Sequence, residues 1–192
     1  MALALASRVL RPAAGIRSSE AGSFLAQLDE LSARMFADLR GLTSDDLAFQ
    51  LRPGTNTIGM LLIHCAGAEV HWLLTATTGT GAEAIRKALG IGPDDDGMPL
   101  SAKGRPPAHL RGWTLADYRR LHDRARRFTR RALAHMGPAD VSRGKARLRW
   151  NGEKQVMNTR WILYHVLEHQ AGHYGQMLLL RHVLRARAAA KR

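Results

Sequence analysis

Three histidines stand four residues apart near the end of the chain, at positions 165, 169 and 173. On a helix, residues at this spacing share one face and lie about 6 Å apart, which is within the reach of one metal ion. The outer two imidazoles are about 12 Å apart along the helix axis, so one ion takes a neighbouring pair. The spacing leaves two pairs open, His165 with His169 and His169 with His173.

A further metal ligand has to come from elsewhere in the chain. His64 lies in the apolar run that begins at Ile58, and a histidine in a core-forming segment needs a partner for its ring nitrogens. His71 follows seven residues later on the same helical face. Three imidazoles from facing helices would leave one coordination position of a divalent ion open, which is typical of catalytic rather than structural sites.

Residues beside these histidines are candidates for the chemistry. A bound divalent ion would hold a water molecule or a thiol and lower its pKa. His165 or His71 could then carry the released proton. Gln176 follows His173 by about one turn and is a candidate to support the metal ligands or to contact substrate.

An apolar period of 3.6 residues marks the elements that must position these side chains. It predicts an all-α fold, an antiparallel four-helix bundle with long connections. A short helix is expected over 82–89, and a small hairpin over 147–157, around the Asn151-Gly152 turn pair. The four long helices are expected at about 19–39, 56–78, 114–136 and 158–187. Asn56 is the expected cap of the second helix, and Thr114 with Asp117 predicts a capping box at the start of the third.

Length and composition predict one domain. The 192 residues are enough for a single core, which we expect over 19–188, with a flexible extension at 1–18 and a basic tail at 189–192. Residues 1–19 contain several arginines and no acidic residue. A targeting segment is therefore the alternative to a loose extension. The single Cys65 cannot form an internal disulfide, and we expect a cytoplasmic protein that does not enter a membrane.

The net charge of +13 raises the question of an anionic partner. Twelve basic residues lie between Arg111 and Arg149, against three acidic ones. Nucleic-acid binding is therefore an alternative, although arginine-rich solvated helix faces are common.

Two motifs together resemble the DinB/YfiT-like superfamily. The first is the stretch from Leu51 to Trp72, which contains His64, and the second runs from Arg160 to Gln176. The resemblance covers about residues 24–184. It implies a four-helix bundle, commonly dimeric, in which one histidine of the second helix and two ligands four residues apart on the last helix hold a divalent metal. In this chain it implies His64, His169 and His173 as ligands.

The resemblance also implies an activity. Characterised members include transferases and isomerases that use bacillithiol, mycothiol or glutathione. We therefore expect a metal-dependent enzyme acting on a small-molecule substrate, in which the metal activates a low-molecular-weight thiol for S-transfer. Zinc is the first candidate metal, with nickel, iron and manganese as alternatives. The alternative functions are a metal-dependent hydrolase with water as nucleophile, and a basic binding module for nucleic acid or protein without enzymatic activity.

Overall fold

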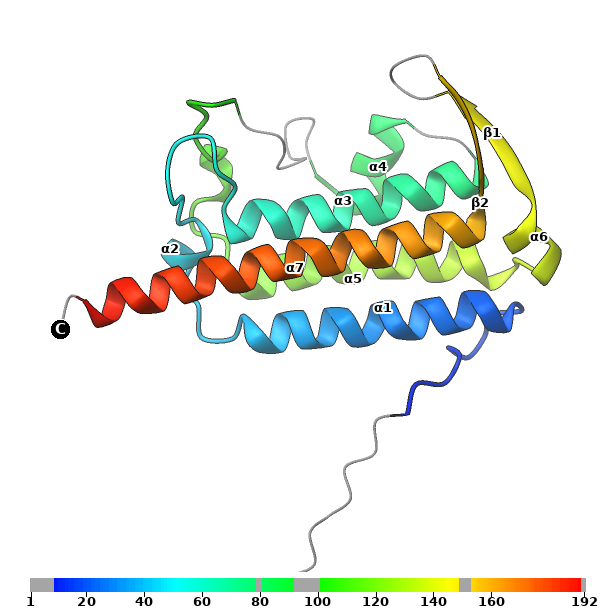
Figure 1. Ribbon diagram of the computed structural model, residues 1–192, viewed down its shortest axis with the longest axis horizontal. Coiled ribbons are helices and arrows are strands. Elements are labelled where there is room, and N and C mark those ends of the chain that lie inside the picture. The colour runs from blue at the N-terminus through cyan, green and yellow to red at the C-terminus, as the bar shows by residue number, and fades with distance from the viewer. Residues whose placement is uncertain (1–8, 79–80, 92–100, 149–152, 191–192) are drawn as a thin grey trace, which may run out of the picture.

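The structure is a computed structural model that describes residues 9–78, 81–91, 101–148 and 153–190. Figure 1 shows the long helices lying side by side, with shorter elements toward their ends. The long helices are α1 (Ser19–Asp38), α3 (Ile58–Thr77), α5 (Leu115–Ala134) and α7 (Thr159–Ala189). The shorter elements are α2 (Ser44–Leu47), α4 (Ala82–Leu89), the 3-10 helix η1 (Ala108–Leu110), α6 (Pro138–Ser142), β1 (Gly144–Leu148) and β2 (Lys154–Asn158). The prediction of an all-α fold is confirmed for the described residues.

Each long helix begins after a side chain that accepts a hydrogen bond from a first-turn amide. Thr114 and Asp117 form the capping box that the sequence predicts at the start of α5. In α3 the cap is Thr57 rather than Asn56, because the Thr57 hydroxyl accepts from the Met60 amide at 3.1 Å. The four caps are Ser18, Thr57, Thr114 and Asn158.

Helices α3 and α5 are neighbours that run in the same direction. Gly59 lies against Tyr118 at one end of the pair, and Glu69 bonds to Arg126 further along both helices. The connection between the two helices spans residues 78–114. A 20-residue helix is about 30 Å long, and a connection of this length can return to its other end.

Helices α1 and α7 also run parallel. Glu20 bonds to Arg160 near the start of both helices, and Ser32 bonds to Gln170 further along. The pairs α3 with α7 and α1 with α5 run antiparallel (Figure 1). The arrangement therefore differs from the fully antiparallel bundle that the sequence predicts, because the long connection after α3 brings α5 back beside it in the same direction.

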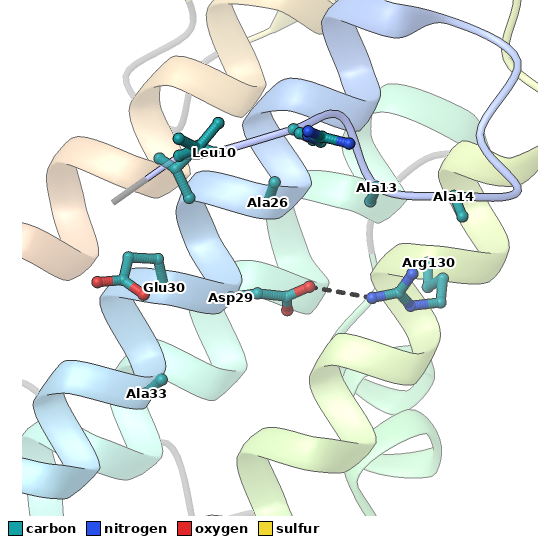
Figure 2. Close-up of a pocket in the computed structure, with 10 residues that line it drawn as sticks. Leu10, Ala13, Ala14, Ala26, Asp29, Glu30, Ala33 and Arg130 are labelled. Carbon is teal, nitrogen blue, oxygen red and sulfur yellow. Dashed lines mark hydrogen bonds and ion pairs between the residues drawn. The ribbon is translucent and has the colours of Figure 1, made fainter. Parts of the chain in front are cut away.

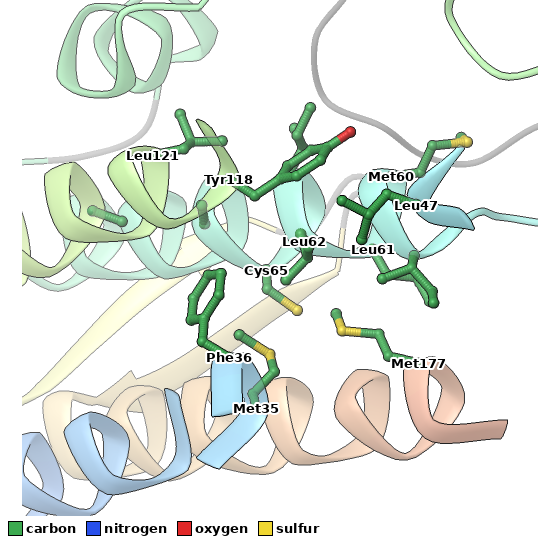
Figure 3. Packing of buried hydrophobic residues seen from close by; sticks show 14 of the residues in the cluster. Met35, Phe36, Leu47, Met60, Leu61, Leu62, Cys65, Tyr118, Leu121 and Met177 are labelled. Carbon is green, nitrogen blue, oxygen red and sulfur yellow. The ribbon is translucent and has the colours of Figure 1, made fainter. Parts of the chain in front are cut away.

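Side chains from all four long helices form the core. Figure 3 shows Met35 from α1, Cys65 from α3, Tyr118 from α5 and Met177 from α7 facing a common interior. A second cluster, around Leu73, occupies the other end of the helices. The core thus holds α3 against both α5 and α7 along its length.

The hairpin predicted before the last helix is present. Strands β1 and β2 pair antiparallel, with Gly144 opposite Asn158 and Leu148 opposite Lys154. The Asn151-Gly152 turn lies outside the described residues. Asn158 ends the hairpin and caps α7, since its side-chain oxygen accepts from the Trp161 amide at 2.9 Å, so the hairpin fixes where α7 begins.

Part of the N-terminal extension lies against α1. The Ala13 amide donates to the Gly22 carbonyl at 2.9 Å, and a Cβ at Gly22 would lie 3.2 Å from Pro12. Figure 2 shows the shallow hollow of about 520 Å³ beside this segment, where the ion pair between Asp29 and Arg130 lies. Pro12, Ala13 and Ile16 therefore lie against the helices, while residues 1–8 lie outside the described part of the chain.

Helix α3 is long and apolar enough to cross a membrane when judged by length and composition alone, with a mean hydropathy of 1.3. It is the one such helix among the described residues. Two thirds of the apolar window (67%) is buried inside the protein, as the central helix of a bundle requires.

Candidate metal centre

The imidazoles of His64, His169 and His173 converge between α3 and α7. The Nε2 atom of His169 lies 3.1 Å from Nε2 of His64 and 3.2 Å from Nε2 of His173. The three candidate ligand atoms lie within 4.8 Å of one another, and all three residues are half-buried. The antiparallel packing of α3 against α7 thus brings together residues that are 105 positions apart in the chain.

The spacing of these nitrogens fits a shared cation. Two nitrogens bound to one ion at zinc distances lie about 2.8–3.4 Å apart for octahedral to tetrahedral angles. The Nε2 atom of His169 faces two ring nitrogens, and a single N–H there would satisfy one of them. A cation among three lone pairs would satisfy all three nitrogens together.

Gln176 fixes the tautomer of His173. Its side-chain oxygen lies 2.9 Å from Nδ1 of His173 and accepts the N–H of that nitrogen. The proton on Nδ1 leaves Nε2 with a free lone pair directed toward the centre. Gln176, predicted as a candidate functional residue, therefore lies directly behind one of the three imidazoles, as the supporting partner of a metal-bound histidine does.

The electrostatics of the centre keep His169 neutral. Burial, together with the neighbouring imidazoles of His173, His64 and His165, lowers the pKa of His169 to about 4. At neutral pH the imidazole of His169 is therefore uncharged. A neutral imidazole is the form that binds a metal ion.

His165 lies one turn from His169 within a group of aromatic rings. Its ring stacks on Trp161 with the planes 6° apart and the centroids 5.0 Å apart, and Trp72 of α3 meets it edge-on at 4.6 Å. The centroids of His165 and His169 are 5.8 Å apart. Nδ1 of His165 bonds to Glu168 at 3.0 Å. The structure therefore places His165 beside the three converging imidazoles.

His71 lies farther from the centre. It follows His64 by two helical turns, about 10 Å along α3, and its ring meets Trp72 edge-on at 5.4 Å. Trp72 and the stacked Trp161 thus form a wall shared by both additional histidines. Trp161 remains 37% exposed.

Cys65 does not belong to the centre. Its side chain is 3% exposed within the core, and burial raises the pKa of its thiol far above the usual value. The thiol is therefore protonated at neutral pH and unsuited to attack a substrate.

Many of the basic residues that suggested an anionic partner bond within the protein. Arg126 and Arg130 pair with Asp29, and Arg124 donates to the Leu89 carbonyl at 2.6 Å. Arg120 pairs with Asp117, about one turn earlier in the same helix. The excess positive charge on α5 is thus partly engaged in holding the helices together.

The fold and this site define a helical protein of the DinB/YfiT-like superfamily, in which three histidines from two neighbouring helices meet at one point. The family model described as mycothiol S-transferase matches residues 23–186. The chain belongs to this family, which is part of that superfamily. No curated protein matches the chain at significant similarity.

Proposed function

We propose that this protein is a metal-dependent S-transferase that joins a low-molecular-weight thiol to a small electrophilic substrate. The observation that carries the proposal is the convergence of three imidazole nitrogens, at 3.1 and 3.2 Å around Nε2 of His169. Membership of the mycothiol S-transferase family supports mycothiol as the thiol to test first.

In this proposal His64, His169 and His173 hold one divalent ion on three nitrogens. A divalent ion bound there supplies Lewis acidity, which lowers the pKa of a thiol or water at its open position. Zinc suits a set of three imidazoles and an open position, and nickel, iron and manganese are the alternatives. Gln176 holds His173 in the orientation that presents its lone pair to the ion.

His165 is the residue that we assign to proton transfer. Glu168 bonds to its Nδ1, which leaves Nε2 as the basic nitrogen. The thiol proton passes to this nitrogen, the thiol sulfur forms a bond to an electrophilic carbon, and the leaving group departs with its bonding electrons. His71 lies beyond Trp72 and is the alternative carrier of the proton.

The remaining parts of the proposal concern the compartment and the oligomeric state of the protein. We propose a cytoplasmic homodimer, because members of the superfamily are commonly dimers and because a single cysteine indicates no need for an oxidising compartment. Light scattering on the purified protein measures the oligomeric state. A strictly monomeric protein at micromolar concentration would contradict this part of the proposal without affecting the metal centre.

The test of the metal centre is the metal content of protein purified without an affinity tag. We expect about one equivalent of a divalent metal per chain in the wild type and less than a tenth of that in His169→Ala. His182→Ala is the matched control, since His182 is exposed on the same helix, and it should retain the wild-type content. Near-zero content in all three proteins, also after incubation with zinc, would remove the proposal.

A further inference from the structure

A buried carboxylate lies in the apolar helix α3. The Glu69 side chain is 1% exposed. Two groups of α5 donate to it. Arg126 donates from Nε to Oε1 at 2.9 Å and from Nη2 to Oε2 at 3.3 Å, and the Thr129 hydroxyl donates to Oε1 at 2.6 Å. Both carboxylate oxygens therefore have partners, and those partners tie α3 to α5.

The contacts continue into the other two long helices. Arg126 also bonds to Asp29 and donates from Nη2 to the Ser32 hydroxyl of α1 at 3.0 Å. Gln170 of α7, which is 2% exposed, donates to the same hydroxyl at 2.7 Å. Glu69, Arg126, Ser32 and Gln170 thus form an unbroken series of hydrogen bonds, the polar chain, with one member from each long helix.

Stability alone does not account for the polar chain. Burial would lower the pKa of Arg126, but Glu69 and Asp29 raise it above its usual value, so the guanidinium stays charged in the core. Replacing a buried ion pair by apolar side chains of similar volume is often neutral or stabilising. Buried polar groups are best attested as devices that fix the register of neighbouring helices. One residue of sliding moves a helix by 1.5 Å, which is enough to break these bonds.

The polar chain begins and ends beside the metal centre. Glu69 follows His64 by five residues on α3, and Gln170 directly follows His169 on α7. Adjacent residues of a helix point about 100° apart. The ring of His169 therefore turns toward α3, while the side chain of Gln170 turns toward α1 and anchors the same turn of α7 from behind.

We propose that the polar chain positions the metal centre, by fixing the register of α3 and α7 at which the three imidazoles converge. Ser32 and Gln170 are then positioning residues that act through the helix bearing His169. The inference rests on the proposed metal centre. It assigns a role to residues that touch neither the ion nor a substrate.

The test is the zinc affinity of the metal-free protein, measured by competition with a chelating dye. Ser32→Ala removes the hydroxyl that joins α1, α5 and α7 and leaves both ionic partners in place. We expect it to weaken zinc binding at least tenfold, as loss of a supporting partner does at other metal sites. Ser32→Thr retains the hydroxyl and should keep wild-type affinity.

A matched control separates positioning from general loss of stability. Val141 is fully buried in the second core cluster, away from the histidines. Val141→Ala should lower the melting temperature and leave zinc affinity unchanged. If Ser32→Ala does not fold, Gln170→Met, which keeps the side-chain length and loses the amide, should weaken zinc binding by a similar factor.

The outcomes distinguish the two proposals. A wild type that binds zinc together with folded Ser32→Ala or Gln170→Met variants of unchanged affinity would overturn the positioning role and leave the metal centre intact. A Val141→Ala variant that loses as much affinity as Ser32→Ala would also overturn it. A wild type that binds no zinc would remove the metal centre and the positioning role together.

Discussion

The Nε2 atoms of His64 and His169 lie 3.1 Å apart across the seam between α3 and α7. This relationship places the histidine of the Ile58 run opposite the middle member of the three histidines on the last helix. The spacing left two ligand pairs open, His165 with His169 and His169 with His173. The structure brings the second pair together with His64. His165 lies at the side of the group, one turn away.

A requirement for added thiol separates the two enzymatic alternatives. We expect consumption of an electrophilic substrate by the metal-loaded protein to depend on mycothiol, because transfer needs its sulfur as nucleophile. In His64→Ala the rate should fall at least a hundredfold, while His182→Ala should keep the wild-type rate. Turnover that proceeds equally without thiol would favour the hydrolase, in which water takes the place of the thiol.

Removal of the Gln176 side-chain oxygen should weaken metal binding. Without an acceptor at Nδ1, the ring of His173 loses the partner that fixes its tautomer and orientation. We expect Gln176→Leu to reduce zinc affinity about 10- to 100-fold in competition with a chelating dye. Gln176→Glu keeps an acceptor and should reduce it less. Equal affinities in the two variants would speak against this role.

The stability of the metal-free protein should fall in acid. Burial lowers the pKa of His122 to about 4, whereas the unfolded chain has a histidine pKa of about 6.5. Between these values the unfolded state binds the extra proton, so the free energy of unfolding decreases as the pH falls from 6.5 to 4. His122 alone should contribute a loss of about 3 kcal/mol across this window. His169 changes stability in the same direction.

Urea unfolding at several pH values checks this prediction. His122→Gln retains an N–H that can donate to the Leu62 carbonyl, which Nε2 of His122 contacts at 2.8 Å, but it has no group that titrates in this range. The variant should therefore lose less stability between pH 6.5 and 4 than the wild type. Identical pH dependence in the two proteins would show that His122 does not titrate as described.

Gly59 lies within helix α3, and we expect that this position accepts no side chain. A Cβ at Gly59 would overlap the Tyr118 hydroxyl and lie 2.8 Å from its Cζ, and the Tyr118 ring is buried and unable to move aside. We expect Gly59→Ala to destabilise the protein by about 1–3 kcal/mol. Gly67→Ala on the same helix meets nothing within 4 Å and should stabilise it by up to about 1 kcal/mol. Chemical denaturation measures both, and a Gly59→Ala variant as stable as Gly67→Ala would contradict the packing.

Local sequence patterns predicted the elements well, because caps and apolar periodicity act within a few residues. The Thr114–Asp117 capping box and the hairpin before α7 are examples. Helix direction was harder to predict. Periodicity reports which face of a helix is apolar, and a connection as long as 78–114 allows either direction for α5.

The polar members of the core were not predictable in the same way. Glu69 is buried within the apolar helix α3, and His122 and Thr129 interrupt the apolar face of α5. Their burial is explained by partners on other helices, which no short window of sequence reveals. The one available signal was a single carboxylate within the apolar run of α3, in a chain whose later helix is rich in arginine.

The separation of 105 residues between His64 and His169 also determines how far apart in time the two residues are translated. Ribosomes add about 5–20 residues per second, so roughly 5–20 s pass between the translation of the first of these histidines and the second. During that interval a nascent chain carries one of the three imidazoles and cannot enclose an ion between α3 and α7. The proposed metal centre can therefore hold an ion only in chains whose last helix has left the ribosome.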